Sequence, residues 1–507
     1  MRQRVTFVHP PEAAIDPDAI TVKSHSLSAP DLSSAVREDR FTLGPADIPA
    51  VPAEILDRYQ ELHIRWAGAD SYQTLEPFSS RVPPGLHVFF TPLQDPEVDT
   101  KTPSTADIPG LCKFVSSMFG SLNCSNPESF VQLPTERFPS SPAFQYYEPL
   151  ESLETFSNYI KSYLCGPADT ACENIDSVQD VSSLDISYDS ISRSVKVTAL
   201  SPLNKQPVSI TAPSKGDHHR TEVGILTPGA PPNMKEGDIG MSGLLTVLKE
   251  SKKPSPVLFS FPSRHKESKT HFSAKFLAPT GLHPTWQLKF SSSNSPLSDA
   301  ACSPHAYLTL PRSVFADRYQ LADELFVQSK NISSLRFMSS PVDLEQPEYT
   351  TLSWGSTVLL ELAPPTDGRD SEWTAEIPLH LRYLKPSASG YTTLQVPYPA
   401  VFWACNANEG MAFSTNPFDR TNLGYDSMFD PRTVFWHMSP EPAPGTLVLT
   451  SKITVPVLKM ESSKWVELGT ALAVGAGFLW VLWCLFAGVS AGKKAAAKAA
   501  KKDEKKA

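Results

Sequence analysis

Short stretches in which apolar and polar residues alternate recur along most of the chain and predict β-strands. Before residue 105 they lie at residues 6–8, 62–66 and 86–90. After residue 241 they are denser, at residues 257–261, 285–290, 307–310, 358–362, 379–383, 401–403 and 447–449. Short strands separated by frequent turn residues predict a mainly β protein, with antiparallel, sandwich-like domains and a few helices.

One segment has the three- and four-residue spacing of an amphipathic helix. Its apolar residues are Leu153, Phe156, Ile160, Tyr163 and Leu164, and a Gly-Pro pair ends the run. Proline makes up 48 of the 507 residues, roughly twice its average usage. Because proline interrupts a helix interior, long helices are not expected over most of the chain.

A different pattern appears near the C-terminus, where residues 468–489 contain no charged side chain. At about 1.5 Å per residue, a helix of this length crosses a hydrocarbon core of about 30 Å. A buried core helix would be shorter and would have polar interruptions. The pattern therefore predicts one transmembrane helix at residues 466–489.

These patterns divide the chain into segments without a collinear internal duplication, and two related β domains remain an alternative. The expected segments are a β-rich region at 1–105, a mixed region with the amphipathic helix at 106–200, a Pro-, Gly- and Lys-rich flexible loop or linker at 201–240, a β domain at 241–465, the membrane helix at 466–489 and a lysine-rich tail at 490–507.

Charge is distributed unevenly about the membrane helix. The net charge is −9, but the tail holds seven lysines against Asp503 and Glu504, so the tail carries +5 and the rest −14. The positive-inside rule places such a tail in the cytosol and the large domain in the lumen or outside the cell. No basic domain precedes the tail, which argues against a nucleic-acid partner.

The N-terminal residues leave a second topology open. They contain no apolar segment of the length found in a conventional cleaved signal peptide. A tail-anchored protein with its large domain in the cytosol would have the same kind of N-terminus.

Cysteines and glycosylation signals favour the lumenal arrangement weakly. Of seven cysteines, Cys484 lies in the membrane helix, and the other six permit fifteen disulfide pairings. An even number is typical of an oxidising compartment. Sequons begin at Asn123 and Asn331, and Asn331 is the stronger candidate because Cys124 lies inside the first sequon, where disulfide formation would compete.

Motifs for catalysis or cofactor binding are scarce. The 12 histidines form no zinc-binding pattern, and no phosphate-binding glycine loop occurs. The Gly-Met-Ser-Gly sequence at residues 240–243 has Leu244 where a nucleophile elbow needs glycine. Asp16-Pro17-Asp18 is interpreted as a turn, and His218-His219 as a solvated pair in a loop. We therefore expect no catalytic residues, metal or cofactor.

The membrane helix carries a candidate contact face for another helix. Gly469, Ala473 and Gly477 recur every four residues and so lie on one side. Small residues let two helix backbones approach closely, although glycine and alanine are also common in membrane helices that have no partner. A single span cannot enclose a cavity for a lipid-linked substrate, so such chemistry would need a multi-pass partner.

Five stretches between about residues 265 and 460 resemble the PIG-X family, the accessory subunit of glycosylphosphatidylinositol (GPI) mannosyltransferase I, and the whole chain resembles its fungal Pbn-type members. The stretches are TGLHP at 280–284, CSPHAYLTLP at 302–311, FADRY at 315–319, IPLHLRY at 377–383 and VPYPAVFWAC at 396–405.

The resemblance implies a single-pass type I protein of the endoplasmic reticulum, with its large domain in the lumen and its C-terminus in the cytosol. Such a protein is a non-catalytic subunit that stabilises a multi-pass catalytic mannosyltransferase, which adds the first mannose to the GPI-anchor precursor. Fungal members also resemble chaperone-like aids to other lumenal proteins. The family supplies no catalytic residues, and Glu504 departs from a strict dilysine retrieval signal.

Within this framework, Cys302 and Cys405 flank the second β-rich block and are the preferred disulfide pair. Other interpretations remain: a tail-anchored adaptor facing the cytosol, or a glycosyltransferase of an unrecognised type. Glycosylation of the large domain would favour the stabilising subunit, and mannosyl transfer by the isolated chain would favour the enzyme.

Overall fold

The structure is a computed structural model of the 507-residue chain. It describes residues 1–93, 107–134, 142–164, 180–212, 219–232, 234–235, 237–279, 281–297, 301–339, 343–365, 370–407, 413 and 416–504. The chain divides into two compact units, which are Met1–Tyr383 with Gln395–Ile453, and Leu384–Leu394 with Thr454–Ala507. Strands predominate among the described residues and helices are few, which confirms the mainly β prediction.

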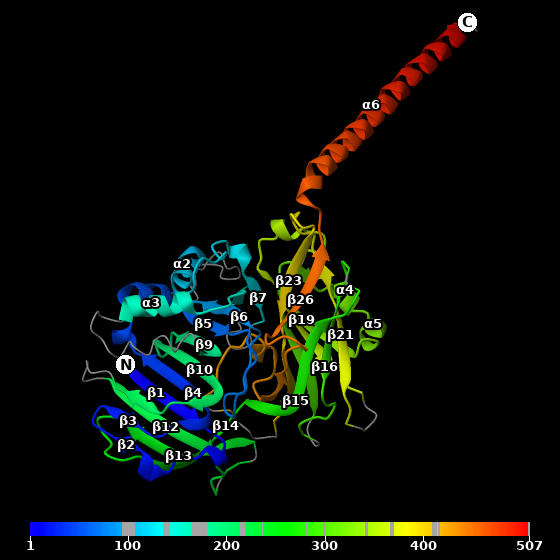
Figure 1. The fold of residues 1–507 in the computed structure, drawn as a ribbon. Coiled ribbons are helices and arrows are strands. Elements are labelled where there is room, and N and C mark those ends of the chain that lie inside the picture. Colours follow the sequence, from blue (N-terminus) through cyan, green and yellow to red (C-terminus); the bar gives the residue numbers. More distant parts are fainter. Residues whose placement is uncertain are drawn as a thin grey trace. The chain divides into compact units, whose positions relative to one another are not determined.

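The first unit contains an eleven-stranded sheet (Figure 1). Its strands, in spatial order, are β14 (Ser255–Pro262), β13 (Asp238–Val247), β12 (Arg220–Pro228), β1 (Arg2–Val8), β4 (Leu32–Leu43), β10 (Ser194–Gln206), β9 (Ser183–Asp189), β5 (Tyr59–Ala67), β6 (Gly85–Pro92), β8 (Ala143–Glu148) and β7 (Val131–Leu133). Strands β1 and β12 are parallel, and the other neighbours are antiparallel.

An eight-stranded sheet follows in the same unit. Its strands, in spatial order, are β19 (Ile332–Met338), β20 (Gly355–Leu362), β17 (Cys302–Pro311), β24 (Ala400–Asn406), β25 (Thr433–Pro440), β15 (His265–Phe276), β16 (Thr285–Phe290) and β21 (Trp373–Pro378). The two edges of this sheet come together, because the backbone N–H of Glu376 in β21 donates to the carbonyl of Lys330, just before β19, at 3.0 Å. The sheet therefore curls back toward itself.

Smaller sheets complete the β structure. They are β11 (Ser209–Thr211) with β3 (Ser26–Ser28) and β2 (Thr21–Val22), β18 (Val314–Phe315) with β22 (His380–Leu381), and β23 (Tyr391–Pro397) with β26 (Thr450–Pro456). The α-helices are α1 (Ala50–Leu56), α2 (Ile108–Phe119), α3 (Glu154–Leu164), α4 (Arg318–Leu321), α5 (Glu324–Gln328) and α6 (Met460–Glu504). Short 3-10 helices lie at Pro11–Ala13, Pro17–Ala19, Pro45–Asp47, Pro127–Ser129, Glu348–Thr350 and Asp426–Met428.

Helices α2 and α3 cover one face of the eleven-stranded sheet beside β5 and β6 (Figure 1). Helix α3 confirms the predicted amphipathic helix, and its Phe156 is 2% exposed. Helix α2 was not predicted. Its signals are a capping residue, Asp107, whose side chain accepts from the N–H of Gly110, and apolar residues at helical spacing. The mixed region therefore contributes two core helices rather than one.

The prediction of a flexible loop at residues 201–240 is wrong for the part that the structure describes, residues 201–212, 219–232, 234–235 and 237–240. This stretch includes the end of β10, all of β11 and β12, and the start of β13. Strand β12 lies inside the sheet, with Val223 and Ile225 buried beside β1. The prolines of this stretch suggested a loop, but two of them occupy positions that a strand tolerates: Pro202 lies where the register of β10 shifts, and Pro228 ends β12.

Two short strand predictions also change. Within residues 447–449 only Val448 forms an isolated bridge, with Asp70, and β26 begins at Thr450. At residues 379–383 the strand is limited to His380–Leu381. Both segments are therefore shorter as strands than their apolar residues suggest.

Candidate functional site

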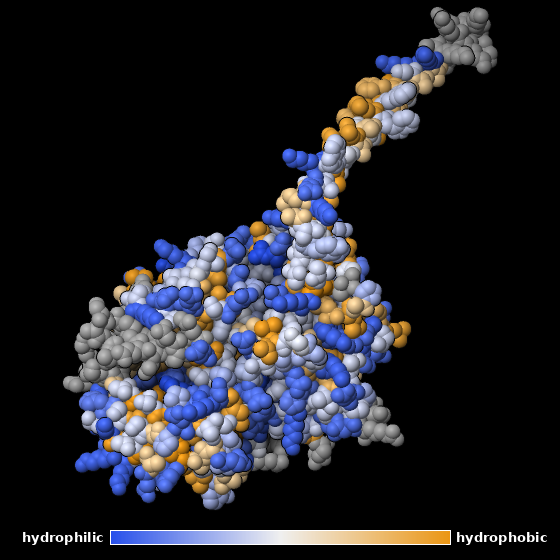
Figure 2. Space-filling view, in the orientation of Figure 1, coloured by the Kyte–Doolittle hydropathy of each residue, from blue (hydrophilic) through white to orange (hydrophobic). Residues whose placement is uncertain are grey.

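Helix α6 is the part of the described chain that is long and apolar enough to cross a membrane. The candidate span is Met460–Ala496, and its most apolar 18-residue window has a mean hydropathy of 2.1 with no residue buried. Apolar residues predominate along its middle (Figure 2). The hydroxyls of Thr470 and Ser490 donate to carbonyls one turn earlier in the same helix, so these polar groups are satisfied without water. The chain thus carries one membrane-anchoring helix near its C-terminus.

The predicted contact face lies inside this span. A β-carbon added at Gly469 or Gly477 would meet no other atom within 4 Å. The helix itself therefore does not need glycine at these positions to avoid a clash. Together with Ala473 they make a smooth face that a second helix can approach, and its role stays a prediction.

Disulfides join two pairs of cysteines in the structure. Cys302 in β17 lies directly opposite Cys405 in β24, and the two sulfur atoms are bonded. A second disulfide joins Cys112 in α2 to Cys124. The sequence left fifteen pairings open and did not single out this second pair. Cys165 and Cys172 lie outside the described residues, and Cys484 in α6 is a free, exposed thiol.

The two sequons occupy different environments. Asn123 is exposed, and the middle residue of its sequon, Cys124, is buried in the disulfide with Cys112. Asn331 is half-buried, and its side-chain Nδ2 donates to the carbonyl of Thr374 at 2.7 Å. Its backbone φ of 56° lies in the left-handed region, which asparagine tolerates better than most residues. Glycosylation at either position stays a prediction.

The short motifs that the sequence offered as weak candidates for catalysis or metal binding lie in ordinary turns and strands where the structure describes them. The Asp16 carboxylate accepts from the backbone N–H of Asp18 and so caps a 3-10 turn. Ser242 lies within β13, between β12 and β14, rather than at a strand-to-helix turn. The described residues contain no group of three or more His, Cys, Asp or Glu side chains arranged to hold a metal ion. His218 lies outside the described residues.

A buried ion-pair cluster joins the two large sheets. Asp185 of β9 accepts from Arg65 of β5 at 2.8 Å, and its other oxygen lies 3.0 Å from Nε of Arg420. Arg65 is 1% exposed and also donates through Nε to the carbonyl of Asn422 at 3.2 Å. The segment around residue 420, between β24 and β25, is thus bound to the eleven-stranded sheet.

A second buried network crosses the same junction through Gln145 of β8. Its side-chain oxygen accepts from the hydroxyls of Tyr307 in β17 and Thr357 in β20, at 3.2 and 2.8 Å. Its backbone carbonyl accepts from the indole N–H of Trp354 at 3.0 Å. Burial lowers the pKa of the neighbouring His87 to about 4, which keeps that ring neutral. The network therefore has a structural role, because it joins β8 of one large sheet to β17 and β20 of the other.

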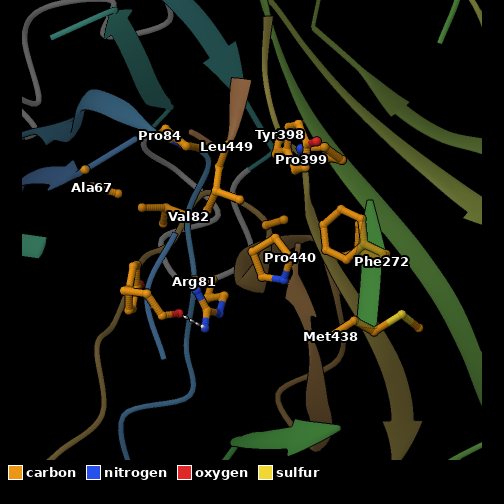
Figure 3. Close-up of a pocket in the computed structure, with 14 residues that line it drawn as sticks. Ala67, Arg81, Val82, Pro84, Phe272, Tyr398, Pro399, Met438, Pro440 and Leu449 are labelled. Atoms are coloured by element: carbon orange, nitrogen blue, oxygen red, sulfur yellow. Dashed lines mark hydrogen bonds between the residues drawn. The ribbon is translucent and has the colours of Figure 1, made fainter. Parts of the chain in front are cut away.

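A small cavity also lies at this junction (Figure 3). Its lining includes Arg81, Phe272, Tyr398 and Leu449, and Arg81 donates to the carbonyl of Tyr72 at 3.2 Å. The centre of a water molecule could move through a volume of 20 Å³ inside this cavity. That is room for roughly one water molecule. A sugar or lipid substrate would not fit.

Comparison with known proteins gives the family. A family profile described as PIG-X / PBN1 matches residues 279–486. Protein pbn1 of Neurospora crassa is 47% identical over 489 residues, which cover 96% of this chain and 95% of that protein. This chain belongs to the PIG-X / PBN1 family.

Other PIG-X / PBN1 proteins match over the same extent. Protein PBN1 of Gibberella zeae is 45% identical, and protein pbn1 of Emericella nidulans is 39% identical, each over 96% of this chain and 95% of the relative. The similarity therefore includes the first half of the chain as well as the segment that the family profile matches. Among solved structures, a collagen adhesin from S. aureus aligns over 87% of this chain and 96% of its own, with 7% identity and a TM-score of 0.14. Such a score is too low to indicate a shared fold.

Membership of the PIG-X / PBN1 family supports an accessory role in GPI-anchor biosynthesis, rather than a catalytic one. Helix α6, the one described helix long and apolar enough to cross a membrane, fits a single-pass membrane protein of that kind.

Proposed function

We propose that this chain is the non-catalytic stabilising subunit of the GPI mannosyltransferase I complex of the endoplasmic reticulum. Its partner is the multi-pass catalytic subunit that adds the first mannose to the GPI-anchor precursor. Family membership across nearly the whole chain is the observation that carries this proposal. A chaperone-like action on other lumenal proteins is a broader form of the same role.

The proposed orientation places the large domain in the lumen and the lysine-rich tail in the cytosol. Two disulfides in the large domain support this orientation over the cytosol-facing adaptor, because disulfides persist in oxidising compartments. The +5 charge of residues 490–507 supports it independently through the positive-inside rule.

Helix α6 is the proposed means of contact with the catalytic subunit in the bilayer. The face formed by Gly469, Ala473 and Gly477 offers the close backbone approach on which membrane helices depend for packing. The partner supplies the several helices that a lipid-linked substrate needs around it.

Substitution on this face tests the proposal. Ala473→Leu should reduce both the catalytic subunit that co-purifies and mannosyl transfer from dolichol-phosphate-mannose several-fold, because the larger side chain separates the two helices. Ala471→Leu is a matched control, since residue 471 lies about 200° around the helix from residue 473. Both variants should insert in the membrane normally.

Three results would count against the proposal. Equal co-purification of the two variants would show that this face does not hold the partner. Normal mannosyl transfer by membranes that lack the chain would contradict the stabilising role. Transfer by the purified chain alone would identify it as an enzyme.

A further inference from the structure

Two histidines from distant parts of the chain meet at the surface of the first unit. His283 precedes β16 and His380 begins β22, and the two segments run side by side because the N–H of Leu381 donates to the carbonyl of Leu282 at 2.9 Å. The Nδ1 atoms of the two rings lie 2.9 Å apart. His283 is exposed and His380 is half-buried.

A buried histidine pair in the same unit provides a comparison. Nδ1 of His265 and Nε2 of His437 are also 2.9 Å apart, and their ring centroids are separated by 5.2 Å. In the exposed pair the centroids are only 4.6 Å apart at the same nitrogen separation, and the rings are nearly perpendicular, at 87°. The rings of His283 and His380 are therefore tilted away from the line joining their nitrogens. A hydrogen bond between them would be bent and weak.

Both Nδ1 atoms are close enough to bind one ion placed beside the line that joins them. A ligating nitrogen lies about 2.0–2.1 Å from a transition-metal ion. Two such nitrogens 2.9 Å apart subtend an angle of about 90° at the ion, as in the tetragonal or octahedral sites of Ni²⁺ and Cu²⁺. The distance between the nitrogens thus fits chelation.

Neighbouring side chains fix the ring of His380 in the form that binds metal. Its Nε2 lies 3.0 Å from the side-chain oxygen of Gln320, which can only accept, so Nε2 carries the proton and Nδ1 keeps its lone pair. Phe315 stacks on the ring with centroids 5.3 Å apart.

We propose that His283 and His380 bind a divalent transition-metal ion through their Nδ1 atoms, with water at the remaining positions. The described residues include no group of three or more potential ligands, so the site is an open two-histidine chelate. Gln320 orients His380 without touching the ion. This proposal is independent of the role in GPI-anchor biosynthesis.

Metal titration of the full chain tests the proposal. Chain in detergent micelles, without a histidine tag, is titrated with NiCl₂ and with ZnCl₂ in a calorimeter at neutral pH. One ion should bind per chain, and His283→Ala or His380→Ala should weaken this binding until calorimetry no longer detects it. Gln320→Ala should weaken it about 10- to 100-fold, as loss of an orienting hydrogen bond typically does. His25→Ala, which removes a different exposed histidine, should bind like the unmodified chain.

Spectroscopy can count the histidine ligands directly, including in variants whose metal affinity is hard to determine by calorimetry. The electron paramagnetic resonance spectrum of bound Cu²⁺ should show two imidazole nitrogens in the unmodified chain and one in His283→Gln. Thermal unfolding without metal should be similar in all variants, which would establish that they fold. Unchanged affinity in the double variant His283→Ala/His380→Ala, or the absence of any stoichiometric binding by the unmodified chain, would overturn the proposal.

Discussion

Asn331 shows how one residue can serve as a sequence signal and as a structural contact. Its side chain reaches from the start of β19 to the carbonyl of Thr374 in β21, and its own carbonyl accepts from the N–H of Ala363 at 2.9 Å. The adjacent Lys330 pairs with Glu376 at 2.6 Å. The contacts with Thr374 and Glu376 link the two edges of the eight-stranded sheet, so the asparagine contributes to closure whether or not it carries a glycan.

Two substitutions separate these roles of Asn331. Asn331→Gln should lower the free energy of unfolding by about 1–2 kcal/mol, because it removes the hydrogen bond to Thr374. Ser333→Ala destroys the same sequon but keeps the asparagine, and Ser333 is exposed. It should therefore leave stability within about 0.5 kcal/mol. Urea unfolding of both variants, each stripped of glycans in detergent micelles, makes the comparison.

The same variants report on topology. If the large domain is lumenal and Asn331 is modified, both lose one glycosidase-sensitive mobility shift, whereas Ser125→Ala reports on the sequon at Asn123. Equal stability of Asn331→Gln and Ser333→Ala would show that the side chain does not help to close the sheet. If protease added to sealed microsomes digested the whole large domain, this result would contradict the lumenal orientation.

At the scale of elements, strands β17 and β24 are joined both by their hydrogen-bonded register and by a covalent bond. Cys302 and Cys405 are 103 residues apart in sequence and directly opposite in the sheet. Between them in the chain lie three of the other six strands of the eight-stranded sheet, β19, β20 and β21. The disulfide therefore restrains the unfolded chain between residues 302 and 405, which includes half of the remaining strands of this sheet.

Removing this disulfide should destabilise the second β block strongly. In the chain-entropy account, closing a loop of roughly 100 residues contributes about 4–5 kcal/mol. The double variant Cys302→Ser/Cys405→Ser should unfold at correspondingly lower denaturant concentration. Cys484→Ser, which changes the exposed thiol of α6, should not shift that transition. Mass spectrometry that finds Cys302 and Cys405 as free thiols in the native protein would contradict the pairing.

At the scale of the whole molecule, both large sheets belong to one compact unit. Asp185 lies between Arg65 and Arg420 at their junction, and all three side chains are almost completely buried. Buried charges are tolerated only when they are paired. The unit should therefore unfold as a whole when this pairing is broken.

Asp185→Asn tests this coupling. It leaves two buried arginines without their shared counter-charge, and should lower the free energy of unfolding by about 3–5 kcal/mol. Near-ultraviolet circular dichroism should record one transition, shifted as a whole. Asp57→Asn breaks an ion pair with Arg193 that is largely exposed, and it should change stability little. Two separate transitions in Asp185→Asn would show that the sheets are independent units.

Particular elements show how far the sequence could predict this structure. Strands β5, β6 and β16 and helix α3 have clear periodicity, and the structure confirms them. The interior strand β12 was missed because its flanking prolines and lysines resemble a loop. Its place is decided by pairing with β1, more than 200 residues earlier, and local pattern carries no information about such a partner.

The candidate sites divide in the same way. The sequence by itself determined the membrane helix and the charge on either side of it, because bilayer thickness sets a length that can be counted along the chain. The sequence also identified the two sequons and the face of small residues on the membrane helix as candidate sites. Only the tertiary structure decided that Asp185 joins two arginines, that Asn331 links two sheet edges and that His283 meets His380. The physical reason is that each depends on the distance between side chains from separate strands and loops, which the folded backbone alone fixes.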